Sequence, residues 1–165
     1  MRHLGAGMLD ELSMTMAERL LELADELASR TPGFYLVNGP GRGNQSTNGF
    51  MTELRRIAAA EFGFDYSEQP ICGPNRLAVD YYFQPEATIV EVALGLRNPN
   101  TEFEKDMLKA VMSQEQGHKV QRLFFISKPG GAKKCSQPGR VEFRLWLKTA
   151  HGIEVEVHDL CARQA

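Results

Sequence analysis

The chain has 165 residues, a formal net charge of −2 at pH 7, a hydrophobic fraction of 42% and a charged fraction of 24%. This length and composition predict a single domain, residues 1–165, with a core of its own. No apolar run approaches the roughly 20 residues that cross a bilayer, and the amino-terminal segment is too polar for a secretory signal. We therefore expect a cytoplasmic protein that has no membrane partner.

The 3 cysteines and 4 histidines are scattered along the chain. No Cys-x-x-Cys pair is present, and no histidines have the spacing of a zinc ligand set. The sequence therefore argues against both a disulfide framework and a structural zinc site.

The amino-terminal segment 1–32 contains a predicted helix, Met8–Arg30. Its leucines and methionines recur at spacings of three and four, with acidic residues on the other side, and Thr31-Pro32-Gly33 ends it. The apolar seam that includes Leu9 and Leu12 could pack on the domain or pair with a second copy, which would make the chain a homodimer.

A glycine-rich segment, residues 38–49, follows and matches no nucleotide-binding motif. A flexible connection or a lid is the expected role, although Arg42 could contact a phosphate. The helix predicted next, Phe50–Phe62, carries Glu53 at the edge of its apolar stripe.

The remaining elements follow from hydrophobic period and turn residues. They are a strand within 64–72, a hairpin from 76 to 94, a helix from Thr101 to Gly117 with a Thr101–Glu104 capping box, a central strand 120–127, a basic loop 128–139, a helix 140–150 and a strand 153–158.

Two acidic residues, Asp80 and Glu91, stand in the otherwise apolar strands of the hairpin. If Phe83 pairs with Thr88, Asp80 falls directly opposite Glu91. Like charges with Cβ atoms about 5 Å apart destabilise a sheet unless a cation lies between them or one carboxyl group keeps its proton. The sequence therefore predicts a metal site at these two residues.

A simpler interpretation makes Asp80 an acid near a turn and Glu91 a solvated residue on the outer face of an ordinary strand. Register decides between the two interpretations, because a slip of one residue moves a side chain to the other face of the sheet.

Residues 118–148 carry 8 lysines and arginines against 1 acid, Glu142. A local excess of positive charge is the footprint of a polyanion partner such as nucleic acid. On charge alone, a solvated basic loop is an equally good interpretation.

The order helix, strand, acidic hairpin, helix, strand, helix, strand is an α/β arrangement. With Asp80 on the second strand and Glu91-Val92-Ala93 on the third, residues 49–158 resemble the PD-(D/E)XK nuclease superfamily. The resemblance implies a restriction-endonuclease-like αβββαβ core, in which helices flank a mixed central β-sheet, with the amino-terminal helix added to it.

The resemblance also implies metal-dependent hydrolysis of phosphodiester bonds in DNA. Asp80, Glu91 and the backbone carbonyl of Val92 would bind Mg²⁺ or Mn²⁺, which prefer oxygen ligands, and Glu53 would assist through a second metal or a water. The nucleic-acid backbone would be held, without reading of bases, by basic residues: Arg42, Lys128, Lys133, Lys134 and Arg140.

One residue departs from the superfamily pattern. The superfamily places a lysine two residues after the second acid, on the same face of the strand, and this chain has Ala93 there. Lys105, in the first turn of the following helix, is the candidate replacement, with Lys109 one turn further on. Ala93 also keeps open a second hypothesis, that the chain is a catalytically inactive nucleic-acid-binding protein. A third is an oligomeric interaction protein built on the amino-terminal helix.

Overall fold

A computed structural model describes residues 13–36, 42–97 and 101–162; the side chains of 42–46 lie outside this description. Five strands form one mixed sheet in the order β1-β2-β3-β4-β5. Strands β1, β2 and β3 are antiparallel neighbours, whereas β3, β4 and β5 run parallel. The strands are β1 (Ser67–Gln69), β2 (Val79–Phe83), β3 (Thr88–Val92), β4 (Arg122–Ser127) and β5 (Glu154–Asp159).

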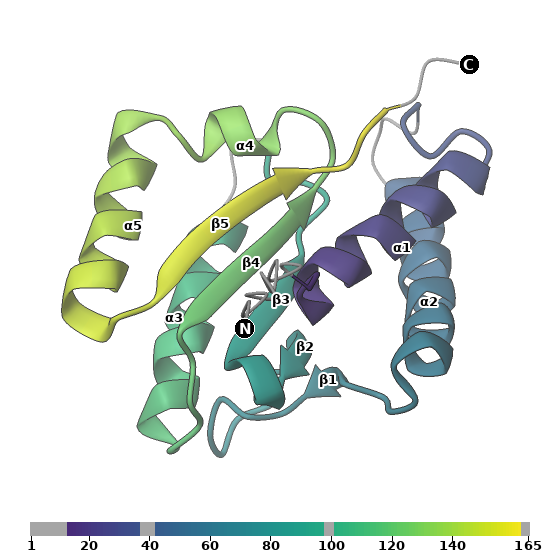
Figure 1. Cartoon of the computed structure of the whole chain (residues 1–165). Helices are drawn as coiled ribbons and strands as arrows, with labels where there is room; N and C mark the ends of the chain where they lie inside the picture. Colours follow the sequence, from purple (N-terminus) through teal and green to yellow (C-terminus); the bar gives the residue numbers. More distant parts are fainter. Residues whose placement is uncertain (1–12, 37–41, 98–100, 163–165) are drawn as a thin grey trace, which may run out of the picture.

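Helices cover both faces of this sheet (Figure 1). The helices are α1 (Met16–Arg30), α2 (Arg42–Phe62), α3 (Glu102–Glu115), α4 (Gly131–Lys134) and α5 (Pro138–His151), and a short 3₁₀ helix, η1 (Gln84–Glu86), connects β2 to β3. The α/β class and the mixed sheet predicted from the sequence are confirmed.

The first helical layer, α1 and α2, buries a continuous core against one face of the sheet. Leu20, Leu23 and Leu27 of α1 and Leu54 of α2 pack with alternate strand residues such as Val90. The described part of the α1 seam therefore packs on its own domain and is not available to a second copy. Leu9 and Leu12, which the sequence placed in the same seam, lie outside the described residues.

The second layer, α3 and α5, covers the opposite face. Phe103 and Met107 of α3 and Leu147 of α5 pack with Ile89 and Phe125 of the central strands. The prediction of a central strand covered on both faces is confirmed by β4, in which the side chains from Leu123 to Ile126 are completely buried.

Several predicted element boundaries were wrong. Helix α1 starts at Met16 because Thr15 and Glu18 form a capping box there. The glycine-rich segment is helical from Arg42 onward, and the predicted basic loop contains α4. The predicted capping box of α3 does not form: Thr101 makes no side-chain cap.

None of the helices in the described part of the chain is long and apolar enough to cross a membrane.

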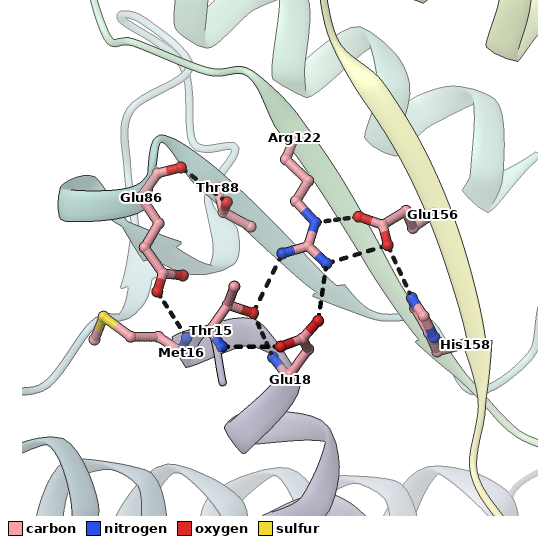
Figure 2. A network of polar contacts seen from close by, with 8 residues as sticks. All are labelled: Thr15, Met16, Glu18, Glu86, Thr88, Arg122, Glu156 and His158. Carbon is pink, nitrogen blue, oxygen red and sulfur yellow. Dashed lines mark hydrogen bonds and ion pairs between the residues drawn. The ribbon is translucent and has the colours of Figure 1, made fainter. Parts of the chain in front are cut away.

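Arg122 of β4 ties α1 to the sheet (Figure 2). Its guanidinium forms an ion pair with Glu156 of β5, and one nitrogen lies 3.1 Å from Glu156 Oε1. It also lies 3.3 Å from Thr15 Oγ1 and 3.9 Å from Glu18 Oε1. Its guanidinium carbon lies over the Phe124 ring, 4.9 Å from the ring centroid. One arginine thus joins two strands and the capped start of α1.

We expect Arg122→Met to lower the free energy of unfolding by about 2 kcal/mol, because Glu156 is left partly buried without its cation. Urea unfolding measures the change. Lys148→Met is the matched control, since its ion pair with Glu154 is 63% and 56% exposed and exposed pairs contribute little. Equal effects of the two substitutions would contradict this role of Arg122.

Candidate functional site

The acidic hairpin has the register that the sequence predicted. Phe83 pairs with Thr88 and Tyr81 with Val90, so the same register places Asp80 opposite Glu91. Both side chains lie on the face of the sheet that α3 covers. The interpretation of Glu91 as a solvated strand residue is wrong, because its side chain is only 3% exposed.

Beyond the Tyr81–Val90 pair, the side chain of Asp80, in place of the backbone of β2, accepts a hydrogen bond from β3. The Val92 N–H donates to Asp80 Oδ2 at 2.8 Å, and the Asp80 N–H makes a long contact of 3.4 Å with Glu91 Oε2. The two carboxylates therefore lie at the end of the hairpin ladder, where the Val92 N–H holds that of Asp80 and the Asp80 N–H contacts that of Glu91.

Lys109 of α3 reaches the acid pair from the helix. Its Nζ lies 2.7 Å from Glu91 Oε1 and 2.9 Å from Asp106 Oδ1, and it donates to the carbonyl oxygen of Ala78 at 3.0 Å. Lys109 thus makes two ion pairs, with Glu91 and Asp106, and one hydrogen bond, to Ala78. Lys109 is thus fixed in place as the counter-charge of Glu91.

The electrostatic balance of this cluster is tight. Burial raises the pKa of Glu91 well above its usual range, with further increases from the nearby charges of Asp80 and Asp106, and Lys109 offsets only part of this. Burial also raises the pKa of Asp106. Burial alone would lower the pKa of Lys109, but the two carboxylates reverse this and raise it. Lys109 therefore stays protonated, surrounded by more acids than it can neutralise.

These residues border a hollow of about 450 Å³ at the carboxyl end of β3 and the amino-terminal end of α3. Its lining carries four carboxyl groups, two lysines and one hydroxyl group: Asp80, Glu91, Thr101, Glu102, Lys105, Asp106 and Lys109. Lys105 is exposed at this hollow, whereas the side chain of Lys109 is only 9% exposed. Of the two lysines that the sequence suggested, Lys109 contacts Glu91, whereas Lys105 borders the same hollow.

The structure does not bring Glu53 to this hollow. Glu53 lies on α2, in the layer that covers the other face of the sheet, and forms an ion pair with Arg56 at 2.6 Å. The side chain of Arg42, at the start of α2, lies outside the described residues.

The basic candidates are divided by their contacts. Lys128 donates to the Phe34 carbonyl at 2.8 Å, and Arg140 lies 3.4 Å from Glu104 Oε1. Lys133, which is exposed, and Lys134, which is half-buried, sit on α4 directly after β4. Because β3 and β4 are parallel, α4 follows the same edge of the sheet as the acidic hollow.

The acid pair could hold a divalent cation through oxygens that Lys109 leaves open. Among the described residues, no group of three or more His, Cys, Asp or Glu side chains is arranged as a metal site. A site here would therefore combine two carboxylates, Asp80 and Glu91, with a backbone oxygen. The donor set fits a hard cation such as Mg²⁺, and the excess of buried negative charge favours its entry.

Asp106 was missed by the sequence reasoning because a charged residue was assigned to the solvent face of α3. It is 4% exposed. The spacing Glu102, Lys105, Asp106, Lys109 places all four on one side of a helix. This spacing could have indicated Asp106 from the sequence, on the assumption that the side of the helix that faces the two acids is polar.

No family model, curated protein or solved structure matches the chain.

Proposed function

We propose that the chain is a divalent-metal-dependent nuclease-like protein that hydrolyses phosphodiester bonds in DNA, with a restriction-endonuclease-like core. The observation that carries the proposal is the convergence of Asp80, Glu91 and a lysine on one hollow. This lysine, Lys109, comes from α3 and not from the strand position that Ala93 holds. Its Nζ lies 2.7 Å from Glu91 Oε1. The element order α2-β1-β2-β3-α3-β4 agrees with the αβββαβ core that the sequence resemblance implies.

In this proposal Asp80, Glu91 and the backbone carbonyl of Val92 bind Mg²⁺. A cation held there would supply a water of lowered pKa and would neutralise charge that grows on the phosphate. The protein's own residues hold this arrangement. Lys109 fixes the Glu91 carboxylate through Oε1, which leaves Oε2 directed toward Asp80.

The two lysines then have different roles. Because Lys109 is buried and pairs with Glu91 and Asp106, its role is to position the Glu91 carboxylate. Lys105, exposed on the rim of the hollow, is the group that orients the attacking water or contacts a phosphate oxygen. Lys133 and Lys134 of α4, at the same edge of the sheet, contribute charge toward the nucleic-acid backbone.

Metal titration by calorimetry, run beside cleavage of labelled DNA, tests the proposal. We expect wild type to bind Mg²⁺ and Mn²⁺, and Asp80→Asn and Glu91→Gln to weaken binding by at least about tenfold and to abolish cleavage. Glu53→Gln, a carboxylate outside the hollow, is the matched control and leaves metal affinity unchanged. Unchanged metal binding in both site variants would refute the metal site.

Ala93 favours a second candidate, a nucleic-acid-binding protein of the same fold that does not cleave. Metal and DNA binding by wild type without cleavage in Mg²⁺ or Mn²⁺ would select this candidate. Cleavage that Lys105→Met reduces, while the fold is retained, would eliminate it.

A further inference from the structure

Asp106 of α3 borders the acidic hollow but is not among the residues that we propose as metal ligands. Its side chain is 6% exposed, and its Oδ1 lies 2.9 Å from Lys109 Nζ. The same Nζ lies 2.7 Å from Glu91 Oε1. One ammonium group is therefore shared between an acid of the sheet and an acid of its own helix.

Stability alone accounts poorly for a carboxyl group at this position. A one-to-one pair of Lys109 with Glu91 would already be balanced, and a further buried carboxylate costs free energy of desolvation. Burial accordingly raises the pKa of Asp106. The packing of α3 on the sheet is made by other residues, namely Phe103, Met107 and Ala110.

The formal charge of the hollow is the charge that a divalent cation would neutralise. Four carboxyl groups and two lysines line it, which is an excess of two negative charges. Without Asp106 the excess would be a single charge. Asp106 lies near enough to act on the acid pair, Asp80 and Glu91: after burial and the charge of Asp80, the charge of Asp106 is the next cause of the raised pKa of Glu91.

We propose that Asp106 is a positioning residue of the metal site, which holds the Lys109 ammonium on Glu91 Oε1 and offsets its charge. Asp80 and Glu91 Oε2 then keep the negative charge that attracts a divalent cation. Asp106 itself does not bind the cation. Without it, the whole charge of Lys109 would fall on the acid pair and would compete with the cation. This inference rests on the metal site of the proposed function.

Calorimetric titration of the full chain with Mg²⁺ and Mn²⁺ tests the role of Asp106. We expect Asp106→Asn to weaken metal binding about tenfold, the lower end of the effect of residues that support metal ligands. Asp106→Glu keeps the charge and should bind within about threefold of wild type. The matched control, Glu104→Gln, removes a carboxylate of the same helix that pairs with Arg140 outside this hollow, and should leave metal affinity unchanged.

A double variant, Asp106→Asn with Lys109→Met, separates this role from a merely structural one. It removes one negative and one positive charge, so the excess of two negative charges is restored and the competing ammonium is gone. We expect its metal affinity to return to within about threefold of wild type. A structural role predicts the opposite, because a second buried substitution would disturb the site further. Circular dichroism confirms folding, and if the double variant is unfolded, the comparison of Asp106→Asn with Asp106→Glu decides.

The outcomes distinguish this inference from the proposed function. A wild type that binds neither Mg²⁺ nor Mn²⁺ would refute the metal site, and the role of Asp106 with it. If wild type binds metal, Glu91→Gln does not and Asp106→Asn binds as wild type does, the metal site stands and Asp106 is only a structural partner of Lys109. The same conclusion follows if the folded double variant binds no more tightly than Asp106→Asn, or if Asp106→Glu binds as weakly as Asp106→Asn.

Discussion

Lys109→Met is expected to lower the free energy of unfolding by about 3 kcal/mol, because it leaves two buried carboxyl groups without their shared cation. The side chains involved are almost fully enclosed: Lys109 is 9% exposed, Asp106 6% and Glu91 3%. The loss stays below that of a fixed buried charge, since the raised pKa of Glu91 lets this group take up a proton. Urea unfolding monitored by circular dichroism measures the change.

The matched control is Lys105→Met, at an exposed lysine one turn earlier on the same helix. It should change stability by about 0.5 kcal/mol or less. Under the proposed nuclease function, cleavage should fall in both variants for different reasons: Lys105 would act at the rim of the hollow, and Lys109 would act through Glu91. A Lys105 variant that lost stability and a Lys109 variant that kept it would reverse this assignment.

Removing the charges together distinguishes ion pairing from packing. A triple variant, Lys109→Met with Glu91→Gln and Asp106→Asn, should recover most of the lost stability, because replacing a whole buried ion cluster costs far less than removing one member of it. If the triple variant remained as unstable as Lys109→Met, the aliphatic stem of Lys109 would be the stabilising group and its charge would not.

The acid pair could be predicted from the sequence because a strand has a two-residue period. Once Phe83 pairs with Thr88, the position of Asp80 relative to Glu91 follows, and a slip of one residue would reverse which side chains face the core. The strands and the packed faces of α1 and α2 were also predictable, because the apolar residues of each element recur with its own period and so fall on one side.

The lysine could not be assigned from the sequence because the buried side of α3 is partly polar. Asp106, Lys109 and Ser113 are buried there, so a hydrophobic pattern rotates the helix toward Leu108, which is in fact exposed. On this side of α3, Lys109 is the counter-charge of Glu91, and this pairing arises only when strand and helix are brought together in space. Patterns within one segment do not contain that information.

The sequence did not predict the start of α2 or the presence of α4, because glycine and lysine residues say little about where a helix begins. Gly131 opens α4, a helix of 4 residues between β4 and α5. Its placement depends on contacts with Ser127 and Asp159, which are distant from one another in sequence. The Asp159 carboxylate accepts the N–H groups of Gly130 at 3.0 Å and Ala132 at 2.9 Å. These contacts hold α4, with Lys133 and Lys134, at the end of the sheet.

Gly131→Ala is expected to lower the free energy of unfolding by about 3 kcal/mol, at the upper end of the usual cost of overpacking. A Cβ atom at residue 131 would lie 2.0 Å from Ser127 Oγ, 2.5 Å from Ser127 Cβ and 3.3 Å from Asp159 Oδ1. Rotation of the hydroxyl cannot relieve the contact with Cβ, so the backbone of α4 must move away from β4. That movement strains the hydrogen bonds that Asp159 accepts.

Gly139→Ala is the matched control, because a Cβ atom there meets nothing within 4 Å and the residue lies in the first turn of α5. It should leave stability unchanged or raise it by up to about 1 kcal/mol, since alanine narrows the unfolded ensemble. A double-mutant cycle with Ser127→Gly, which removes the colliding Cβ, should show that Gly131→Ala costs much less in that background. An unchanged cost would mean that close approach to Ser127 is not what requires glycine at residue 131, and that α4 is held at the end of the sheet by Asp159 alone.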